Sequence, residues 1–175
     1  MPGQVEAGHE PVAAAAVVVH RDRSPDAEVL LVRRRSDPDH AVPFAGQWVV
    51  PGGRVDDVDR TGEGDGAQEV ARRAAVRELA EEVGIVVGGD DLRSLWELES
   101  GIPSGLRFRI SYFETWLPPG QAARPDGVEL DECRWIRPSV AVAQGRSGRL
   151  DVPPATLETL RRLATQGLSP DGGGT

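Results

Sequence analysis

Residues 51–85 read PGGRVDDVDRTGEGDGAQEVARRAAVRELAEEVGI, a double glycine followed by a polar segment and a long helical pattern. Within 67–83, apolar residues at 76, 79, 80 and 83 are spaced i, i+3, i+4 and i+7, which places them on one stripe of a helix. Gly84 follows this segment, and glycine is common at the position immediately after the end of a helix. The stretch therefore predicts a glycine turn and then a core-facing helix over 67–83.

Three glutamates share the other side of this predicted helix. At 100° per residue, Glu78, Glu81 and Glu82 fall within an arc of about 100° opposite the apolar stripe. Like charges three or four positions apart repel by roughly 0.2–0.5 kcal/mol per pair, so the grouping needs a positive neighbour. One interpretation is a solvated face, neutralised by the nearby Arg72, Arg73 and Arg77. The other is a divalent cation, because carboxylates beside exposed backbone carbonyls are the ligands that Mg²⁺ or Mn²⁺ prefers.

Strands surround this helix in the sequence. Alternating or continuous apolar runs bounded by turn residues predict strands at 12–19, 28–34, 48–50, 92–100, 107–117 and 128–136. Two further helices are expected at 138–143 and 153–165, the second with proline at its start. Mixed strands with three helices, without regular βαβ alternation, indicate an α+β or mixed-sheet α/β sandwich. At 175 residues we expect one domain, over 1–166, with a disordered tail at 167–175.

Composition narrows the function classes. The formal net charge is −8 and all 20 basic residues are arginine, so broad binding to a nucleic-acid polymer is not expected. The single cysteine, Cys133, cannot form an internal disulfide, which favours a reducing compartment, by default the cytoplasm. The apolar run at 12–19 is too short to cross a bilayer, and no basic segment precedes it. No membrane partner is therefore expected.

The string RELAEEVG at 77–84, followed by Ile85, resembles the core of the Nudix box, R-E-apolar-x-E-E-x-G-apolar. Seven residues separate Glu69 from Arg77, as in that family. The resemblance implies a Nudix-type α/β/α sandwich with a mixed central sheet and a pyrophosphohydrolase activity. It also implies that Glu78 and Glu82 are the principal metal ligands. Glu81 and the carbonyl of Gly53 would assist, Arg77 would orient the carboxylates, and Glu69 would support the helix start. A plain salt bridge is the alternative for Glu69 and Arg77.

One feature departs from the family pattern. The family places five residues between the box glycine and its first glutamate, whereas fifteen residues separate Gly53 from Glu69 here. The extra segment, about 56–66, is polar and glycine-rich, so a surface loop can accommodate it at small entropic cost. The ligand positions stay intact, but the geometry of this loop and its role are left open.

Substrate contacts are predicted from two further segments. Alternation on a strand aims Arg34 opposite to its neighbour Arg33, so at most one or two arginines of the run at 33–35 can reach a phosphate. A solvated charge run is the alternative. The acidic stretch 126–132 offers Glu129 and Glu132 as substrate-side groups or as a distant catalytic base, although a glutamate of the box is the preferred base. Aromatic residues near the strands, such as Phe108, could contact a nucleobase, but most such residues belong to cores.

Beyond the box, residues 28–164 are similar in layout to the branch that includes the peroxisomal coenzyme A diphosphatase of mammals. The resemblance implies hydrolysis of a diphosphate linkage in a nucleoside diphosphate derivative, a small-molecule substrate. Coenzyme A or an acyl derivative is the first expectation, with ADP-ribose, NADH and nucleoside triphosphates next. A non-catalytic Nudix-fold module that senses a nucleotide is the alternative, and the complete set of glutamates argues against it. By analogy with relatives, a homodimer is a candidate assembly.

Overall fold

A computed structural model describes residues 10–37, 42–62 and 64–166. A mixed sheet of seven strands forms its centre, in the order β3-β2-β1-β6-β5, while β4 pairs with β1 and β7 pairs with β2. The strands are β1 (Val12–His20), β2 (Val29–Arg34), β3 (Trp48–Val49), β4 (Gly52–Arg54), β5 (Arg93–Gly101), β6 (Arg107–Trp116) and β7 (Leu130–Ile136). The described chain thus contains every strand predicted from the sequence, together with β4.

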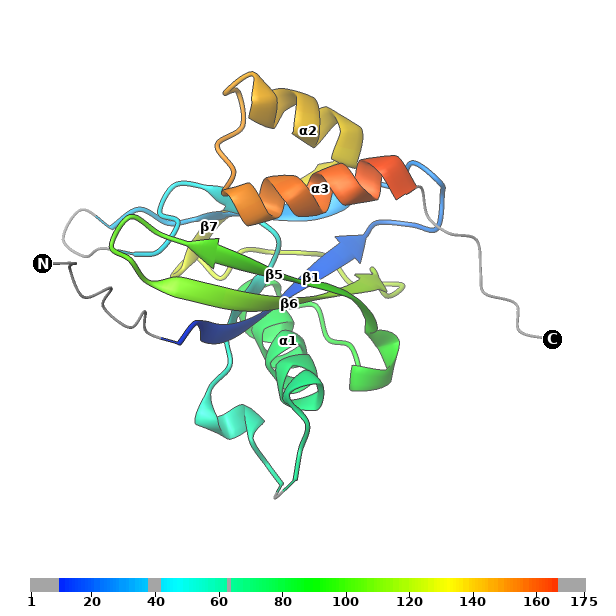
Figure 1. The fold of residues 1–175 in the computed structure, drawn as a ribbon. Helices are drawn as coiled ribbons and strands as arrows, with labels where there is room; N and C mark the ends of the chain where they lie inside the picture. The colour runs from blue at the N-terminus through cyan, green and yellow to red at the C-terminus, as the bar shows by residue number, and fades with distance from the viewer. Residues whose placement is uncertain (1–9, 38–41, 63, 167–175) are drawn as a thin grey trace, which may run out of the picture.

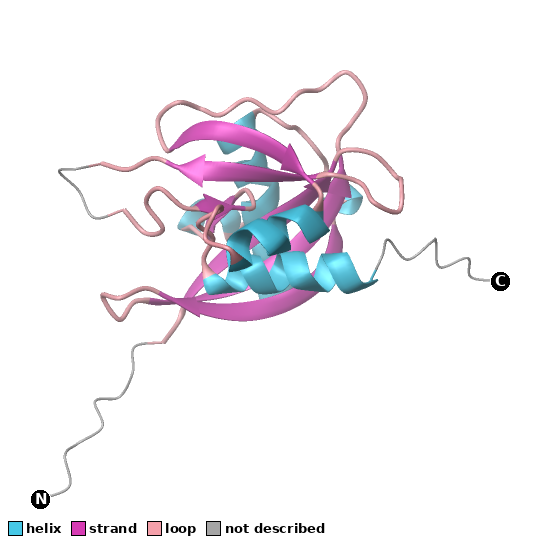
Figure 2. Ribbon diagram, turned by 90° about the horizontal axis from the view of Figure 1, so that it is seen from above, coloured by secondary structure: helices cyan, strands magenta, loops and turns pink. Residues whose placement is uncertain are grey.

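Helices cover both faces of this sheet. The helix α1 (Ala67–Val83) lies on one face, and α2 (Pro138–Arg146) and α3 (Pro154–Gln166) lie together on the other (Figures 1 and 2). Short 3₁₀ turns, η1 (Asp57–Asp59) and η2 (Gly89–Asp91), flank α1. This α/β/α sandwich with a mixed sheet confirms the fold class expected from the sequence.

The central strand β1 explains how two cores form. Its run of Ala and Val is apolar on both faces, as is usual for a strand covered on both sides. Val17 and Val19 face α1, whereas Val18 faces the layer of α2 and α3, so alternate residues enter two separate hydrophobic clusters. Parallel β6 occupies one edge of β1 along its whole length.

The other edge of β1 is divided between two partners. β2 pairs with β1 at His20, and β4 pairs with it at residues 14–16. The double glycine, expected to be a turn, is therefore part of a short strand, because its backbone hydrogen bonds are made to β1. β2 and β4 therefore share one edge of β1 and pair with different parts of it.

Most element boundaries agree with expectation. Helix α1 spans the predicted residues, and Gly84 ends it in the left-handed conformation at φ 70°. Helix α2 continues to Arg146, three residues beyond the predicted end at 143, since its last carbonyls are capped by the Ser147 and Gly148 N–H groups. The predicted disordered tail at 167–175 lies outside the described residues.

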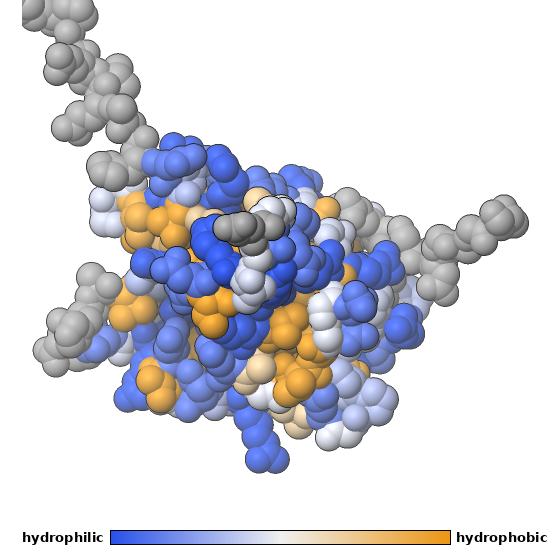
Figure 3. Space-filling view, turned by 90° about the horizontal axis from the view of Figure 1, so that it is seen from below, coloured by the Kyte–Doolittle hydropathy of each residue, from blue (hydrophilic) through white to orange (hydrophobic). Residues whose placement is uncertain are grey.

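The outer face that carries α1 is mainly hydrophilic, with separate small apolar areas (Figure 3). Within the described residues, none of the helices combines the length and apolar composition needed to cross a bilayer.

Candidate active site

Glu82 is buried beneath β4, with only 3% of its surface exposed. Its Oε2 accepts a hydrogen bond of 2.8 Å from the Gly52 N–H, and its Oε1 lies 3.5 Å from Nη1 of Arg34. The expectation that all three glutamates face away from the core is therefore wrong for Glu82. Helix α1 packs against β4 as well as β1, so its buried arc is wider than its apolar stripe.

Burial dominates the electrostatics of this carboxylate. Removal from solvent raises the pKa of Glu82 to about 8, although the Gly52 N–H and the Arg34 guanidinium oppose this change. Burial also raises the pKa of Glu78 above its ordinary range, while Arg77 acts to lower it. One buried and one half-buried carboxyl group on the same helix therefore favour a nearby positive charge.

Glu78 is pressed against the backbone of β4. A Cβ atom placed on Gly53 would lie 2.3 Å from the carboxyl carbon of Glu78, so a side chain at this position would displace the carboxylate. Oε1 of Glu78 accepts a 2.7 Å hydrogen bond from Nη1 of Arg77. The same Nη1 lies 3.3 Å from Oε2 of Glu81, whose side chain is 64% exposed. Glycine at 53 thus lets the helix and strand approach closely.

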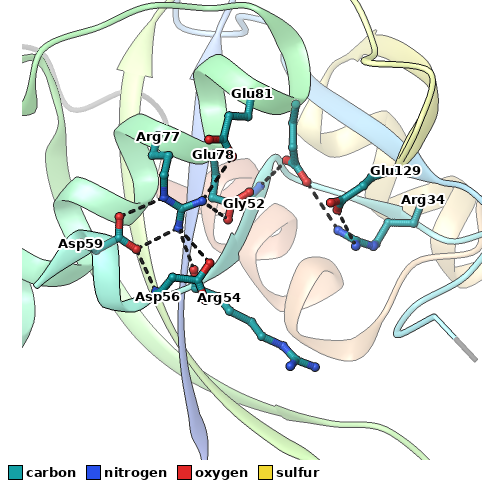
Figure 4. Close-up of polar contacts among 10 residues, drawn as sticks. Arg34, Gly52, Arg54, Asp56, Asp59, Arg77, Glu78, Glu81 and Glu129 are labelled. Carbon is teal, nitrogen blue, oxygen red and sulfur yellow. Dashed lines mark hydrogen bonds and ion pairs between the residues drawn. The ribbon is translucent and has the colours of Figure 1, made fainter.

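Arg77 is the centre of this network (Figure 4). Its Nε and Nη2 donate to the two carboxylate oxygens of Asp59 at 3.0 and 2.8 Å, a bidentate pair, and Nη2 also donates to the carbonyl of Arg54 at 3.1 Å. Burial of Asp59 acts to raise its pKa, but hydrogen bonds from Arg77 and from the Asp56 N–H outweigh it, and the pKa is lowered. The hydrogen bonds that Arg77 donates to Asp59 raise the pKa of Arg77. Arg77 is therefore a fixed cation that holds Glu78 and β4 together.

Glu69, expected to support this arrangement, lies elsewhere. Its side chain is 51% exposed, and its ion pairs are made with Arg72 at 3.7 Å and Arg73 at 3.8 Å, on the same helix. Asp59 was not among the predicted site residues. Residues 54–58 separate Gly53 from Asp59, which is the five-residue spacing of the family pattern, so the spacing could have identified it. The extra residues of this box therefore come after Asp59 in the sequence. In that segment, Nη1 of Arg73 donates hydrogen bonds to the Asp65 carboxylate and to the Asp59 carbonyl.

The two predicted arginines separate as strand alternation requires. Arg34 lines the cavity beside the carboxylates, and its Nε is buried without a hydrogen-bond partner. Arg33 instead donates to Asp131 at 2.8 Å and lies over the Trp48 ring. Arg34 is thus placed to meet an anion, and Arg33 is part of a surface ion-pair cluster.

The acidic segment divides in the same way. Glu129 lines the cavity, with Oε2 3.3 Å from Nη2 of Arg34, whereas Glu132 pairs with Arg33 and Arg134 on the outside. Asp126 fixes the loop before Glu129, because its Oδ1 accepts the N–H groups of residues 128, 129 and 130 at 2.9–3.0 Å. The Asp126 N–H donates to the Glu82 carbonyl at 3.0 Å, which ties this loop to α1.

These groups border one cavity of about 430 Å³, a size typical of small-molecule sites. Its wall includes Arg34 at the end of β2 and residues 52–54 of β4. Glu78, Glu81 and Arg77 line one part of it, and Arg34 and Glu129 line the side next to them.

The donor set fits a divalent cation, although it is not already assembled. Among the described residues, no three acidic, histidine or cysteine side chains converge closely enough to form a ready-made metal site, because Glu78 and Glu81 are turned to Arg77. The chemistry nonetheless suits Mg²⁺ or Mn²⁺: the donors are all oxygens, and the glycine at 53 leaves the carboxylate of Glu78 against the β4 backbone. Glu78, Glu81, Glu82 and the carbonyl of Gly53 are the groups that would hold it.

Comparison with known proteins gives a consistent family. The sequence profile of the NUDIX domain matches residues 10–155. The crystal structure of a Nudix hydrolase from Alicyclobacillus acidocaldarius is similar, with a TM-score of 0.72, 22% identity, and coverage of 88% of this chain and 91% of that one. The Nudix domain of Shewanella oneidensis NrtR, in a complex with ADP ribose, has a TM-score of 0.62 and 15% identity, and covers 93% and 92% of the two chains.

A curated relative shares more sequence over part of its length. An octanoyltransferase from Myxococcus xanthus is 32% identical over 160 residues, which is 90% of this chain. This chain spans about a third (35%) of the length of that protein. The similarity therefore concerns one region of a longer chain.

Proposed function

The chain belongs to the Nudix family and is a Nudix hydrolase, and we propose that it cleaves the diphosphate linkage of a nucleoside diphosphate derivative with the help of Mg²⁺ or Mn²⁺. The observation that carries this proposal is the placement of Glu78 and Glu81 beside Gly53 and Arg77 in one cavity, with Glu82 buried against the neighbouring Gly52 N–H. Divalent ions are the general cofactors of this family.

The role of the ion would be to neutralise the phosphate oxygens and the charge that develops on them, which is the chemistry it supplies when bound. Arg77 holds the carboxylate of Glu78 against β4, and Asp59 keeps Arg77 in that position. Arg34 offers a guanidinium beside Glu82 for a phosphate group. Substrate phosphates would thus meet a cation held by α1 on one side and Arg34 on the other.

A glutamate of α1 is the proposed acceptor for the proton of the attacking water. Glu81 is the most exposed of the three, so it is the most accessible to solvent. Glu129 lines the same cavity and is the second candidate for this step. Water attacks phosphorus and the anhydride P–O bond breaks. A diphosphate that joins two groups gives two phosphate monoesters, whereas a nucleoside triphosphate gives a nucleotide and inorganic pyrophosphate or phosphate.

Coenzyme A or an acyl derivative is the first specific substrate proposed, followed by ADP-ribose, NADH and nucleoside triphosphates. The layout of residues 28–164 supports the first choice, and the ADP ribose bound to the similar NrtR domain supports the second. We further propose a cytoplasmic location, from the lone Cys133, and a homodimer by analogy with relatives.

A substrate screen tests this function. Diphosphate compounds of these four classes are incubated with the full chain and Mg²⁺ or Mn²⁺, and the products are identified by mass spectrometry. Release of AMP or another nucleoside phosphate is expected, and substitution Glu78→Gln or Glu82→Gln should reduce the rate at least a hundredfold. A glutamine variant with full activity on the best substrate would refute the assignment, and turnover of none of these compounds would favour a nucleotide-sensing module.

A further inference from the structure

The cavity has a second, aromatic part that the metal-dependent chemistry does not use. Phe44 and Phe108 line it, with their ring centroids 5.9 Å apart and the ring planes tilted by 48°. Ile110 and Tyr112 continue this wall along β6. It belongs to the sheet face opposite α1, because these residues alternate with those that face that helix.

Small residues on the adjacent strand give this part its depth. Ala14 and Ala16 of β1 lie beside Ile110 and Tyr112 in the parallel register and line the same cavity. Two hydroxyl side chains, Ser100 of β5 and Thr156 of α3, also line it. The compartment is therefore apolar in its walls, with hydroxyl groups able to hydrogen-bond the edge of a planar ring.

The backbone at Phe44 is strained. Among the described residues, Phe44 is the one non-glycine position with positive φ, at 60°, a conformation that bulky side chains rarely adopt. The loop is held in place by β2: the Arg34 N–H donates to the Gln47 carbonyl at 3.0 Å, and the Gly46 N–H donates to the Arg34 carbonyl at 2.8 Å. Strain kept at a cavity-lining aromatic residue indicates a functional constraint on that residue.

Arg54 joins the two parts of the cavity. Its carbonyl accepts from Arg77, and its guanidinium carbon lies 5.6 Å from the centroid of the Phe108 ring (Figure 4 shows the Arg54 side chain leaving the Arg77 cluster). A ligand that reaches from the carboxylates to Phe108 therefore passes this cation. An anionic segment placed there would be attracted by the positive charge of Arg54.

We propose that the aromatic pair Phe44–Phe108 is the stacking site for the nucleobase of the substrate, with the diphosphate extending past Arg54 to α1. This inference rests on the proposed function, since it assigns the end of a nucleoside diphosphate derivative that does not react. Stacking on aromatic rings tolerates different bases, because every base has a π-face. Because binding depends on stacking, purines bind better than pyrimidines. Because few polar groups line this part, the site distinguishes little between adenine and guanine.

The test compares two ligands that differ by the base alone. AMP and ribose 5-phosphate, neither of which contains a diphosphate to hydrolyse, are titrated into the full chain with Mg²⁺ by isothermal calorimetry. AMP is expected to bind at least tenfold more tightly, which corresponds to about 1.4 kcal/mol. Equal affinities for the two ligands would overturn the proposal.

Two variants and a control localise the effect. Phe108→Leu keeps apolar volume without a ring, and it should reduce the advantage of AMP about fivefold to tenfold. Phe44→Gly removes a ring and relieves the positive φ, so it should reduce the same advantage while leaving the melting temperature unchanged or higher. Val86→Ala, at an exposed position that does not line the cavity, should change neither the affinity advantage of AMP over ribose 5-phosphate nor the melting temperature.

The outcomes separate this inference from the proposed function. A Phe44→Gly protein that melts lower and keeps the full AMP advantage would show that Phe44 only packs the loop, and would overturn the proposal. If the two ring variants lose affinity for 4′-phosphopantetheine and keep the AMP advantage, the compartment binds the other half of the substrate. This result would also overturn the proposal. Failure to hydrolyse any diphosphate would refute the proposed function alone, because AMP binding is measured without turnover.

Discussion

Replacing the buried Glu82 by glutamine should stabilise the metal-free protein at alkaline pH. Burial raises the pKa of Glu82 from its ordinary 4.5 to about 8 in the folded chain. Between these values the folded state keeps a proton that the unfolded state has lost, so wild-type stability falls as pH rises through this window. Glutamine does not titrate, and its carbonyl can still accept the hydrogen bond from Gly52.

The size of the effect follows from the shift. At about 1.4 kcal/mol per pKa unit, the difference amounts to about 3 kcal/mol at pH 7 and approaches about 5 kcal/mol above pH 8. The pKa of about 8 already includes the hydrogen bond from Gly52 and the charge of Arg34, so a gain on the order of 3 kcal/mol is expected at pH 7. For a domain of this size, that gain raises the melting temperature by roughly 6–12 °C.

The assay is thermal unfolding from pH 5 to 9, in EDTA and again with Mg²⁺. Wild type should lose stability with rising pH in EDTA and recover it with Mg²⁺, because an ion that binds only the folded state stabilises it. In Glu82→Gln, position 82 no longer titrates, so its contribution to the loss of stability with rising pH in EDTA and to the recovery with Mg²⁺ should be absent. Glu81→Gln is the matched control, since its side chain is 64% exposed, and it should keep the wild-type pH dependence in EDTA. An E82Q protein with the wild-type pH slope would refute the reasoning.

Three further predictions test the supporting contacts. Asp59→Asn removes the buried bidentate partner of Arg77 and should lower the free energy of unfolding by about 3–5 kcal/mol in urea titrations. Glu69→Gln, the control at an exposed ion pair, should change the same free energy by less than about 0.5 kcal/mol. A larger loss in Glu69→Gln than in Asp59→Asn would contradict the pairing of Asp59 with Arg77. Gly53→Ala should displace the Glu78 carboxylate and weaken Mg²⁺ binding, measured by calorimetry, at least tenfold, and unchanged binding would argue against this carboxylate as a ligand. Asp126→Ala frees the three N–H groups that fix the loop of Glu129, so kcat should fall in this variant. Adding Glu129→Gln to Asp126→Ala should cause no further fall, because both changes affect the same group. Additive losses in the double variant would show that Asp126 acts independently of Glu129.

Local sequence determined the parts of this protein that depend on neighbouring residues in the chain. The periodicity over 67–83 predicted α1 and its glycine end, because a helix is set by contacts three and four residues apart. The order of residues in RELAEEVG identified the family, and the profile match over 10–155 confirms it. Strand alternation foresaw that Arg33 and Arg34 point to opposite sides, although the choice of Arg34 for the cavity came from the structure.

Tertiary structure alone decided the contacts between segments that are distant in sequence. Asp59 reaches Arg77 across residues 60–76; its spacing from Gly53 makes it a candidate, but only the folded chain shows that it pairs with Arg77. The burial of Glu82 likewise depends on β4, a three-residue strand whose glycines have no strand propensity and which forms because β1 offers an unpaired edge. Helical periodicity describes one helix in isolation, whereas burial and ion pairing depend on what packs against it, so only the folded chain could place these groups.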